Sequence, residues 1–270
     1  MSLLKTATET SVSEIRRTSY VNLRIPRGLS FFDPYLRYFV NEVLEAGGEA
    51  HVARTSDGTV SGIFIYDGFE KTGTIYTRSR EVFDYFHGLR PFSLLFAEMD
   101  IEREREVYDI YTIDLDALGG HRFRHEVSLA GEEHIGEIEQ FMASTHPGIN
   151  RRWVDVAFRN GDRCVIARLG NEIAGLGWLS LVNGIGRVHS LYVRPQFRGM
   201  GMGEDILYAR LLWLKSQHAR SAFSEISRHN LSSSRVAMKG HMSASGHIFQ
   251  YFGSEPAMVD PLRRTRTAQP

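Results

Sequence analysis

Cysteine is almost absent from this chain of 270 residues, which carries only Cys164. One thiol cannot form an internal disulfide, so the composition excludes a disulfide-stapled secreted domain and favours a reducing compartment. Cys164 opens the apolar run Cys164-Val165-Ile166-Ala167. In such a run we expect a buried structural thiol rather than a nucleophile.

An excess of charge of either sign is also missing. Lys and Arg together number 32, as do Asp and Glu, and the formal net charge is zero. The composition therefore gives no sign of nucleic-acid or anionic-membrane binding. Apolar runs such as residues 92–97 are too short to cross a bilayer, and the polar N-terminus has no signal-peptide core. We expect a cytoplasmic protein that binds neither nucleic acid nor membrane.

Two common phosphate-binding patterns are missing as well. The Rossmann fingerprint would need a glycine where Glu204 stands, and the chain has no Gly-Lys-Ser/Thr sequence. What is present is a run of alternate glycines, Gly199, Gly201 and Gly203, between an apparent strand and a helix. Glycines let a ligand approach the main chain, and a helix N-terminus attracts anions. The segment therefore predicts a phosphate-binding turn.

The second half of the chain predicts one coherent order of elements. Hydrophobic periodicity and turn residues between residues 123 and 252 indicate β-α-α-β-β-β-α-β-α-β. Tight turns at Gly170-Asn171 and Asn183-Gly184 join the three central strands. This order predicts an α/β fold.

The first half echoes the second at a constant offset of 113 residues. Gly62 corresponds to Gly175, and Gly73 corresponds to Gly186. Such an offset predicts duplication of one supersecondary unit, although two unrelated hairpins of similar composition remain an alternative. After Thr77 the first half runs directly into a helix, without a glycine turn. We therefore expect no pyrophosphate site in it.

The glycine turn resembles the coenzyme A pyrophosphate loop of the GNAT superfamily of acyl-CoA-dependent N-acetyltransferases. The resemblance rests on Arg198, Gly201 and Gly203 behind a Leu-Tyr-Val strand end and Pro195, and the order of elements agrees across the second half. It implies an α/β (α+β) fold with a GNAT-like mixed central sheet flanked by helices, in two tandem halves. Residues 1–120 would be a degenerate GNAT-like domain without the coenzyme loop, and residues 121–270 the catalytic acetyltransferase domain.

The resemblance also implies which residues bind acetyl-CoA as cosubstrate. The strand end would pair with the pantetheine arm, the loop amides would bind the pyrophosphate, and the start of the next helix would contact the coenzyme. For Asn230 a simple helix cap is an equal alternative. The implied coenzyme-binding residues are Leu191, Tyr192, Val193, Arg198, Gly199, Met200, Gly201, Met202, Gly203, Asn230 and Ser233. No metal ligand is implied.

The catalytic residues depart from the usual family pattern. Arg187 stands where many members have a glutamate, and Ala237 stands where a tyrosine is expected. His189 occupies the position of a histidine in serotonin N-acetyltransferases, and its ordinary pKa near neutrality suits a general base. Strand alternation predicts that Arg187, His189 and Leu191 share one face. A structural role for His189 is the alternative, and Tyr251 is either a substitute acid or a core aromatic.

Together these features predict an acyl-CoA-dependent N-acetyltransferase. The amine of an acceptor, a small molecule or a protein N-terminus, would attack acetyl-CoA directly in a ternary complex. The alternative is a non-catalytic module that senses coenzyme A or acyl-CoA. Residues 145–153 would cover the acceptor side of the cleft, and the protein is expected to be a monomer or a homodimer.

Overall fold

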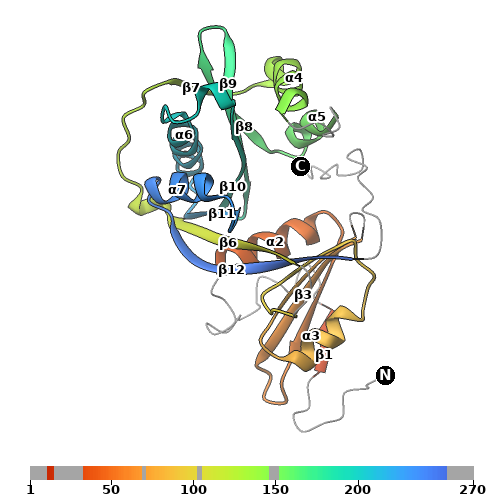
Figure 1. Cartoon of the computed structure of the whole chain (residues 1–270). Coiled ribbons are helices and arrows are strands. Elements are labelled where there is room, and N and C mark those ends of the chain that lie inside the picture. The colour runs from red at the N-terminus through yellow and green to blue at the C-terminus, as the bar shows by residue number, and fades with distance from the viewer. Residues whose placement is uncertain (1–10, 15–32, 69–70, 102–104, 146–151, 254–270) are drawn as a thin grey trace. The chain divides into compact units, whose positions relative to one another are not determined.

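The computed structural model describes residues 11–14, 33–68, 71–101, 105–145 and 152–253 (Figure 1). The chain divides into two compact units. Unit 1 is Met1–Asp109 with a C-terminal segment that starts at Ser245, and unit 2 contains Ile110–Ala244. The division thus falls near the predicted residue 120, but the last strand belongs to unit 1 and not to the C-terminal half.

Unit 1 is a mixed sheet with two described helices. Its described strands lie in the order β1-β2-β3-β4-β5-β12. In the described part of this sheet, β4 and β5 pair in parallel and the other neighbouring strands pair antiparallel. Another strand, β6, crosses the boundary between the units. The elements are β1 Ser11–Glu14, α2 Asp33–Glu45, β2 Glu49–Arg54, β3 Val60–Asp67, β4 Thr72–Thr77, α3 Arg80–His87, β5 Leu94–Ala97, β6 Arg105–Asp114 and β12 Ser243–Phe252.

The last strand, β12, joins unit 1 because its apolar residues fit the core of that unit. Phe249 and Tyr251 are buried with Phe64 and Leu95, and Tyr251 pairs with Leu95 across the β12–β5 ladder. The hydroxyl of Tyr251 donates to the carbonyl of Met99 at 3.1 Å. Tyr251 is thus a hydrogen-bonded core aromatic, as the structural alternative expected.

Unit 2 contains the order of elements that the sequence predicts, except for the final predicted strand, most of which lies in unit 1 as β12. Its strands lie in the order β6-β11-β10-β9-β8-β7, and β10 and β11 pair in parallel. Short 3-10 turns lie at Leu115–Ala117, Glu132–His134 and Pro195–Phe197. The remaining elements are β7 Glu126–Leu129, α4 Ile135–Thr145, α5 Arg152–Arg159, β8 Arg163–Leu169, β9 Glu172–Val182, β10 Ile185–Val193, α6 Met202–Ser216, β11 Ser221–Ser227 and α7 Leu231–Lys239.

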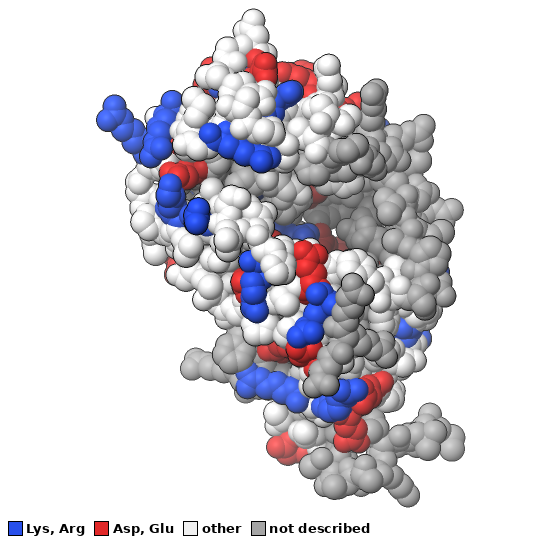
Figure 2. All heavy atoms as spheres, in the orientation of Figure 1, with Lys and Arg blue, Asp and Glu red and all other residues white. Residues whose placement is uncertain are grey.

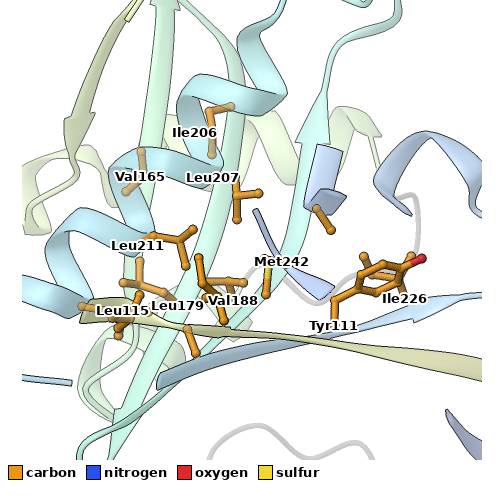
Figure 3. Close-up of a cluster of buried hydrophobic side chains, with 14 of the residues drawn as sticks. Tyr111, Leu115, Val165, Leu179, Val188, Ile206, Leu207, Leu211, Ile226 and Met242 are labelled. Atoms are coloured by element: carbon orange, nitrogen blue, oxygen red, sulfur yellow. The ribbon is translucent and has the colours of Figure 1, made fainter. Parts of the chain in front are cut away.

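The two faces of the unit 2 sheet carry different helices (Figure 1). Side chains from α4 and α5 share one buried cluster with Cys164 and Trp178 of the sheet. On the opposite face, Ile206, Leu207 and Leu211 of α6 pack on the strands (Figure 3). Each such buried aliphatic side chain stabilises the unit by about 2 kcal/mol. This packing fixes the start of α6 against the end of β10.

The two predicted repeats share a detail of strand pairing. In unit 1, Ala53 pairs with Gly62, and the β2–β3 register shifts at the next residue. In unit 2, Ala167 pairs with Gly175, and the β8–β9 register again shifts at the next residue. Shared bulge positions of this kind support the duplication that the constant offset predicts.

The described surface mixes charges of both signs. On the face shown in Figure 2, basic and acidic side chains of the described residues are interspersed rather than gathered by sign. Among the described residues, no helix combines the length and apolar character needed to cross a membrane.

Candidate functional site

The strand that leads to the glycine turn, β10, contains a bulge. Its pairing with β9 shifts between His189 and Tyr192, and Ser190 inside the shift has a φ of +48°. The extra residue reverses the side-chain alternation beyond it. Leu191 therefore packs with the α6 cluster, whereas His189 lies opposite Trp178, which packs under α4 and α5. The prediction that Leu191 shares the face of His189 is wrong, because strict alternation does not anticipate a bulge.

On its side opposite to β9, β10 pairs with β11 over only part of its length. Parallel pairing is defined from Ile185 opposite Ser221 as far as Arg187 opposite Phe223, and the described ladder ends there. Residues 188–193 are therefore not paired with β11 in the described chain, although the carbonyls of His189 and Val193 accept from Arg210 and Arg198, each at 3.0 Å. The remaining N–H and C=O groups of this edge are left for another extended partner. This geometry accommodates the backbone pairing that the resemblance implies for a pantetheine arm.

The turn after β10 presents its amides to an incoming anion. Gly199 and Gly201 have φ values of +81° and +88°, which side chains rarely adopt. Within the described chain, the amides of residues 199–203 donate to no backbone acceptor outside the helix, and α6 begins without a side-chain cap. The first N–H groups of a helix have no intrahelical partner. The turn and the N-terminus of α6 thus form a concave set of donors.

A cavity of about 520 Å³ lies over this turn. It gathers the strand end, the glycine turn and the start of α7, as the sequence predicts. Met200 is the exception among the predicted coenzyme-binding residues, since it is 47% exposed and does not line the cavity, and the predicted base His189 does not line it either. The lining residues are Leu191, Tyr192, Val193, Phe197, Arg198, Gly199, Gly201, Met202, Gly203, Glu204, Asn230, Ser232, Ser233, Val236 and Lys239.

Cations surround this cavity. A Cβ atom at Gly201 would lie 2.4 Å from Nη1 of Arg124, so the Arg124 guanidinium lies directly over the turn. Arg198 places its guanidinium 5.4 Å from the ring centroid of Tyr192. Lys239 lines the cavity and forms an ion pair with Glu204. The one acidic side chain in the lining is thereby neutralised, and the site favours an anion.

A buried carboxylate fixes Arg124 in this position. Asp205 is fully buried in the first turn of α6 and accepts hydrogen bonds from the backbone N–H groups of Arg124 and His125 at 3.1 and 3.0 Å. Its oxygens also lie 2.6 Å from His121 Nε2 and 2.7 Å from His125 Nδ1. Burial raises the pKa of Asp205, but these hydrogen bonds outweigh it and the net pKa is lowered. The carboxylate therefore ties the segment before β7 to the turn.

Asn230 caps α7 and lines the cavity at the same time. Its Oδ1 accepts from the backbone N–H of Ser233 at 3.2 Å and from the hydroxyl of Ser232 at 3.2 Å. The capping alternative is thus confirmed for Asn230. Asn230 and Ser233 both line the cavity, where they are also placed to contact a ligand.

His189 lies beside an ion pair that the sequence did not predict. Arg187 on β10 binds Glu225 on β11, with Nε donating to Oε2 at 3.2 Å and Nη2 3.1 Å from Oε1. Continuing the parallel register beyond Arg187 places His189 opposite Glu225, where the strands separate. Burial, followed by the charges of Arg187 and Arg210, lowers the pKa of His189 well below its ordinary value. The imidazole is therefore neutral at neutral pH, and the same surroundings make it a weaker base than a free histidine.

Arg210 on α6 stabilises the bulge in β10. This fully buried side chain of α6 donates from Nη1 to the carbonyls of Trp178 and His189, each at 3.0 Å. Gly177 makes room for it, because a Cβ there would lie 2.9 Å from Arg210 Cζ. Burial lowers the pKa of Arg210 to about 9, so it is still charged at neutral pH. Arg210 thus positions the backbone of His189.

We expect Arg210→Met to lower the free energy of unfolding by about 2 kcal/mol. The variant keeps the aliphatic stem but leaves two carbonyls without their hydrogen-bond donor. We expect the cost of these two unpaired carbonyls to exceed the free energy gained by removing a buried charge. Urea unfolding checks this value, and Arg159→Met, at an exposed ion pair of α5, is the control expected to change little. Equal stability of Arg210→Met and the native chain would contradict this role.

Other predicted residues have structural surroundings or lie outside the described part. Cys164 is fully buried, and burial raises the pKa of its thiol to about 12, which disfavours the nucleophilic thiolate. Ala237 is buried in the α6 cluster. Most of the predicted acceptor loop, residues 146–151, lies outside the described residues. Among the described residues, no cluster of His, Cys, Asp and Glu side chains could hold a metal ion.

The family of unit 2 is given by its sequence. Residues 121–241 match the acetyltransferase (GNAT) family. This part of the chain is a GNAT acetyltransferase domain, and the family implies acyl-CoA-dependent acyl transfer. No curated protein matches the sequence.

Solved structures are similar in fold. A GCN5-related N-acetyltransferase from Sphaerobacter thermophilus has a TM-score of 0.55 at 11% identity, over 78% of this chain and 82% of its own. A GNAT-family acetyltransferase from Colwellia psychrerythraea has a TM-score of 0.56 at 10% identity, over 90% of this chain and 100% of its own. A Drosophila protein has a TM-score of 0.64 at 9% identity, over 89% of this chain and 98% of its own. At such identities the likeness concerns the fold alone.

Proposed function

We propose that unit 2 is an N-acetyltransferase that uses acetyl-CoA as cosubstrate. The observation that carries this proposal is the joining of three features in one cavity: the open edge of β10, the uncapped N-terminus of α6 and the surrounding cations. The amides of the Gly199–Gly203 turn would hold the pyrophosphate, with Arg124 beside them. Coenzyme A is an extended polyanion, which this combination of charge and shape fits.

Acetyl-CoA supplies an acyl group already activated as a thioester. The protein then has to orient an amine, receive its proton and stabilise negative charge on the carbonyl oxygen. We assign proton acceptance to His189, at the point where β10 and β11 separate. Glu225, on the facing strand, is held in place and balanced in charge by Arg187.

The release of free coenzyme A thiol tests this activity. Acetyl-CoA is incubated with the protein and a panel of peptides, polyamines and amino sugars, and the amide product is identified by mass spectrometry. Amine-dependent thiol release with a matching acetylated product supports the enzyme. Tight coenzyme binding without release for any amine would instead support the sensor module.

We further propose that unit 1 is a degenerate copy that does not bind coenzyme, so that one coenzyme molecule binds per chain. Only two residues, Arg78 and Ser79, separate β4 from α3. The Ser79 side chain already accepts the hydrogen bond of Val82 N at 3.3 Å, so this helix N-terminus is capped from within. Calorimetric titration with coenzyme A should give a stoichiometry of one. A stoichiometry of two would contradict this assignment.

A further inference from the structure

Unit 1 contains a cavity of its own at the open ends of β4 and β5. Its volume is about 680 Å³, and carbon atoms make up most of its exposed lining although most of the lining residues are polar. Thr77 and Arg78 line it at the end of β4, Glu98 and Met99 after β5, and residues 245–247 from β12. Every lining residue belongs to unit 1. The cavity is therefore separate from the coenzyme site proposed for unit 2.

One polar atom in this lining has no partner. Oε2 of Glu98 is buried, and within the described chain no group donates a hydrogen bond to it. Burial raises the pKa of Glu98 to about 7, and the charge of Arg78 offsets this effect only in part. A buried carboxyl oxygen without a donor is costly, so it is rarely left without a partner. A ligand with an N–H group would remove that cost.

The repeat shows what kind of donor is missing. The β4–β5 ladder begins with Thr72 opposite Leu94, and the β10–β11 ladder begins with Ile185 opposite Ser221. Glu98 follows Leu94 by four residues, and the second glutamate, Glu225, follows Ser221 by four. The two glutamates therefore lie at the same distance from the start of each parallel ladder, Glu98 directly after β5 and Glu225 within β11.

The partner of this glutamate differs between the units. In unit 2, Arg187 is the third residue of its ladder and binds Glu225 through two N–H groups. The third residue in unit 1 is Thr74, which carries no charge. Unit 1 thus keeps the acidic group and a cavity but has no cation at the position of Arg187; Arg78 in the lining acts on Glu98 through its charge, without a hydrogen bond to Oε2. A cationic ligand would replace it.

We propose that the unit 1 cavity binds a small molecule made of a primary ammonium group on an apolar body. The ammonium donates to Oε2 of Glu98, and the apolar body fills the cavity between β4, β5 and β12. Since unit 1 lacks a glycine turn, the site binds its amine without transferring an acyl group to it. This assignment is independent of the activity proposed for unit 2.

The probe is n-hexylamine, and its binding to the full chain is monitored by two-dimensional amide NMR. The titration is done at pH 8, where Glu98 is ionised in most molecules. We expect saturable shifts of the amides of Thr77, Glu98, Met99 and Gly246 with n-hexylamine. Hexanoate, of similar length and opposite charge, should give none. Shifts of equal size with both probes, or no saturable shift with n-hexylamine at these residues, would overturn the proposal.

A pair of matched variants isolates the carboxylate. Glu98→Gln should weaken n-hexylamine binding at least tenfold, while Glu81→Gln, the same change on the exposed surface of α3, should leave it unchanged. Amide spectra of both variants confirm that the fold is kept. Unchanged affinity in a folded Glu98→Gln protein would overturn the proposal. Coenzyme A binding measured on the same samples is expected to be native, which separates this test from that of unit 2.

Discussion

Gly201→Glu should reduce the affinity for coenzyme A at least a hundredfold. The residue has a φ of +88°, where a side chain costs about 1–2 kcal/mol. A Cβ atom would displace the end of the Arg124 side chain, and the new carboxylate would face the proposed pyrophosphate position. Backbone strain and charge repulsion therefore act together. Calorimetric titration of the native and variant chains measures the change.

The control for this variant is Gly136→Glu. Gly136 is an exposed glycine of α4 with open space around its Cβ position, so the same substitution should leave coenzyme affinity native. Circular dichroism of both variants confirms that they fold. A folded Gly201→Glu protein that binds coenzyme A within threefold of native would contradict the assignment of the turn.

His189→Ala should lower turnover by about a hundredfold or more, the usual scale for a positioned general base. Coenzyme affinity should barely change, because the amides of the turn remain. The measurement is steady-state kinetics with the best amine of the acceptor panel. Near-native turnover in the variant would assign His189 a structural role, and a large loss in Glu225→Gln alone would move proton acceptance to Glu225.

The pH dependence of turnover offers a second test of His189. Its pKa is lowered well below the ordinary value by burial and by the charges of Arg187 and Arg210. The neutral, proton-accepting form is thus fully populated near neutrality and is lost only as the pH falls through the lowered pKa. We expect turnover to be level around neutrality and to fall in acid, whereas a histidine with an ordinary pKa would place the ascending limb near neutrality. His189→Ala should remove that acid limb.

The glycine turn could be predicted because its features are local. The end of β10, the alternate glycines and the start of α6 are contiguous in the sequence, and the structure brings them together in one cavity. The repeat was visible for the same reason, since at both Gly62 and Gly175 a side chain would crowd the helix packed on the sheet, through Val82 of α3 and Ile206 of α6. Steric constraints between nearby residues restrict which amino acids fit, and these restrictions can be recognised in the sequence.

The remaining features depend on contacts between distant segments. Arg124 reaches the turn because Asp205, some 80 residues later, anchors its backbone. Nothing near Glu225 in the sequence shows that it binds Arg187. The terminal strand joins unit 1 through Tyr251 and Leu95, which are far apart in the chain. Such pairings are decided by three-dimensional packing, and periodicity within a single segment does not report them.

The central claim is that the turn at residues 199–203 binds the pyrophosphate of acyl-CoA. The most direct measurement is an amide NMR titration of the native chain with acetyl-CoA. The account predicts saturable binding, with the largest shifts at the N–H groups of Gly199, Gly201 and Gly203 and with smaller shifts along Leu191 to Val193. Absence of binding, or saturable binding that leaves these amides unshifted, would contradict it.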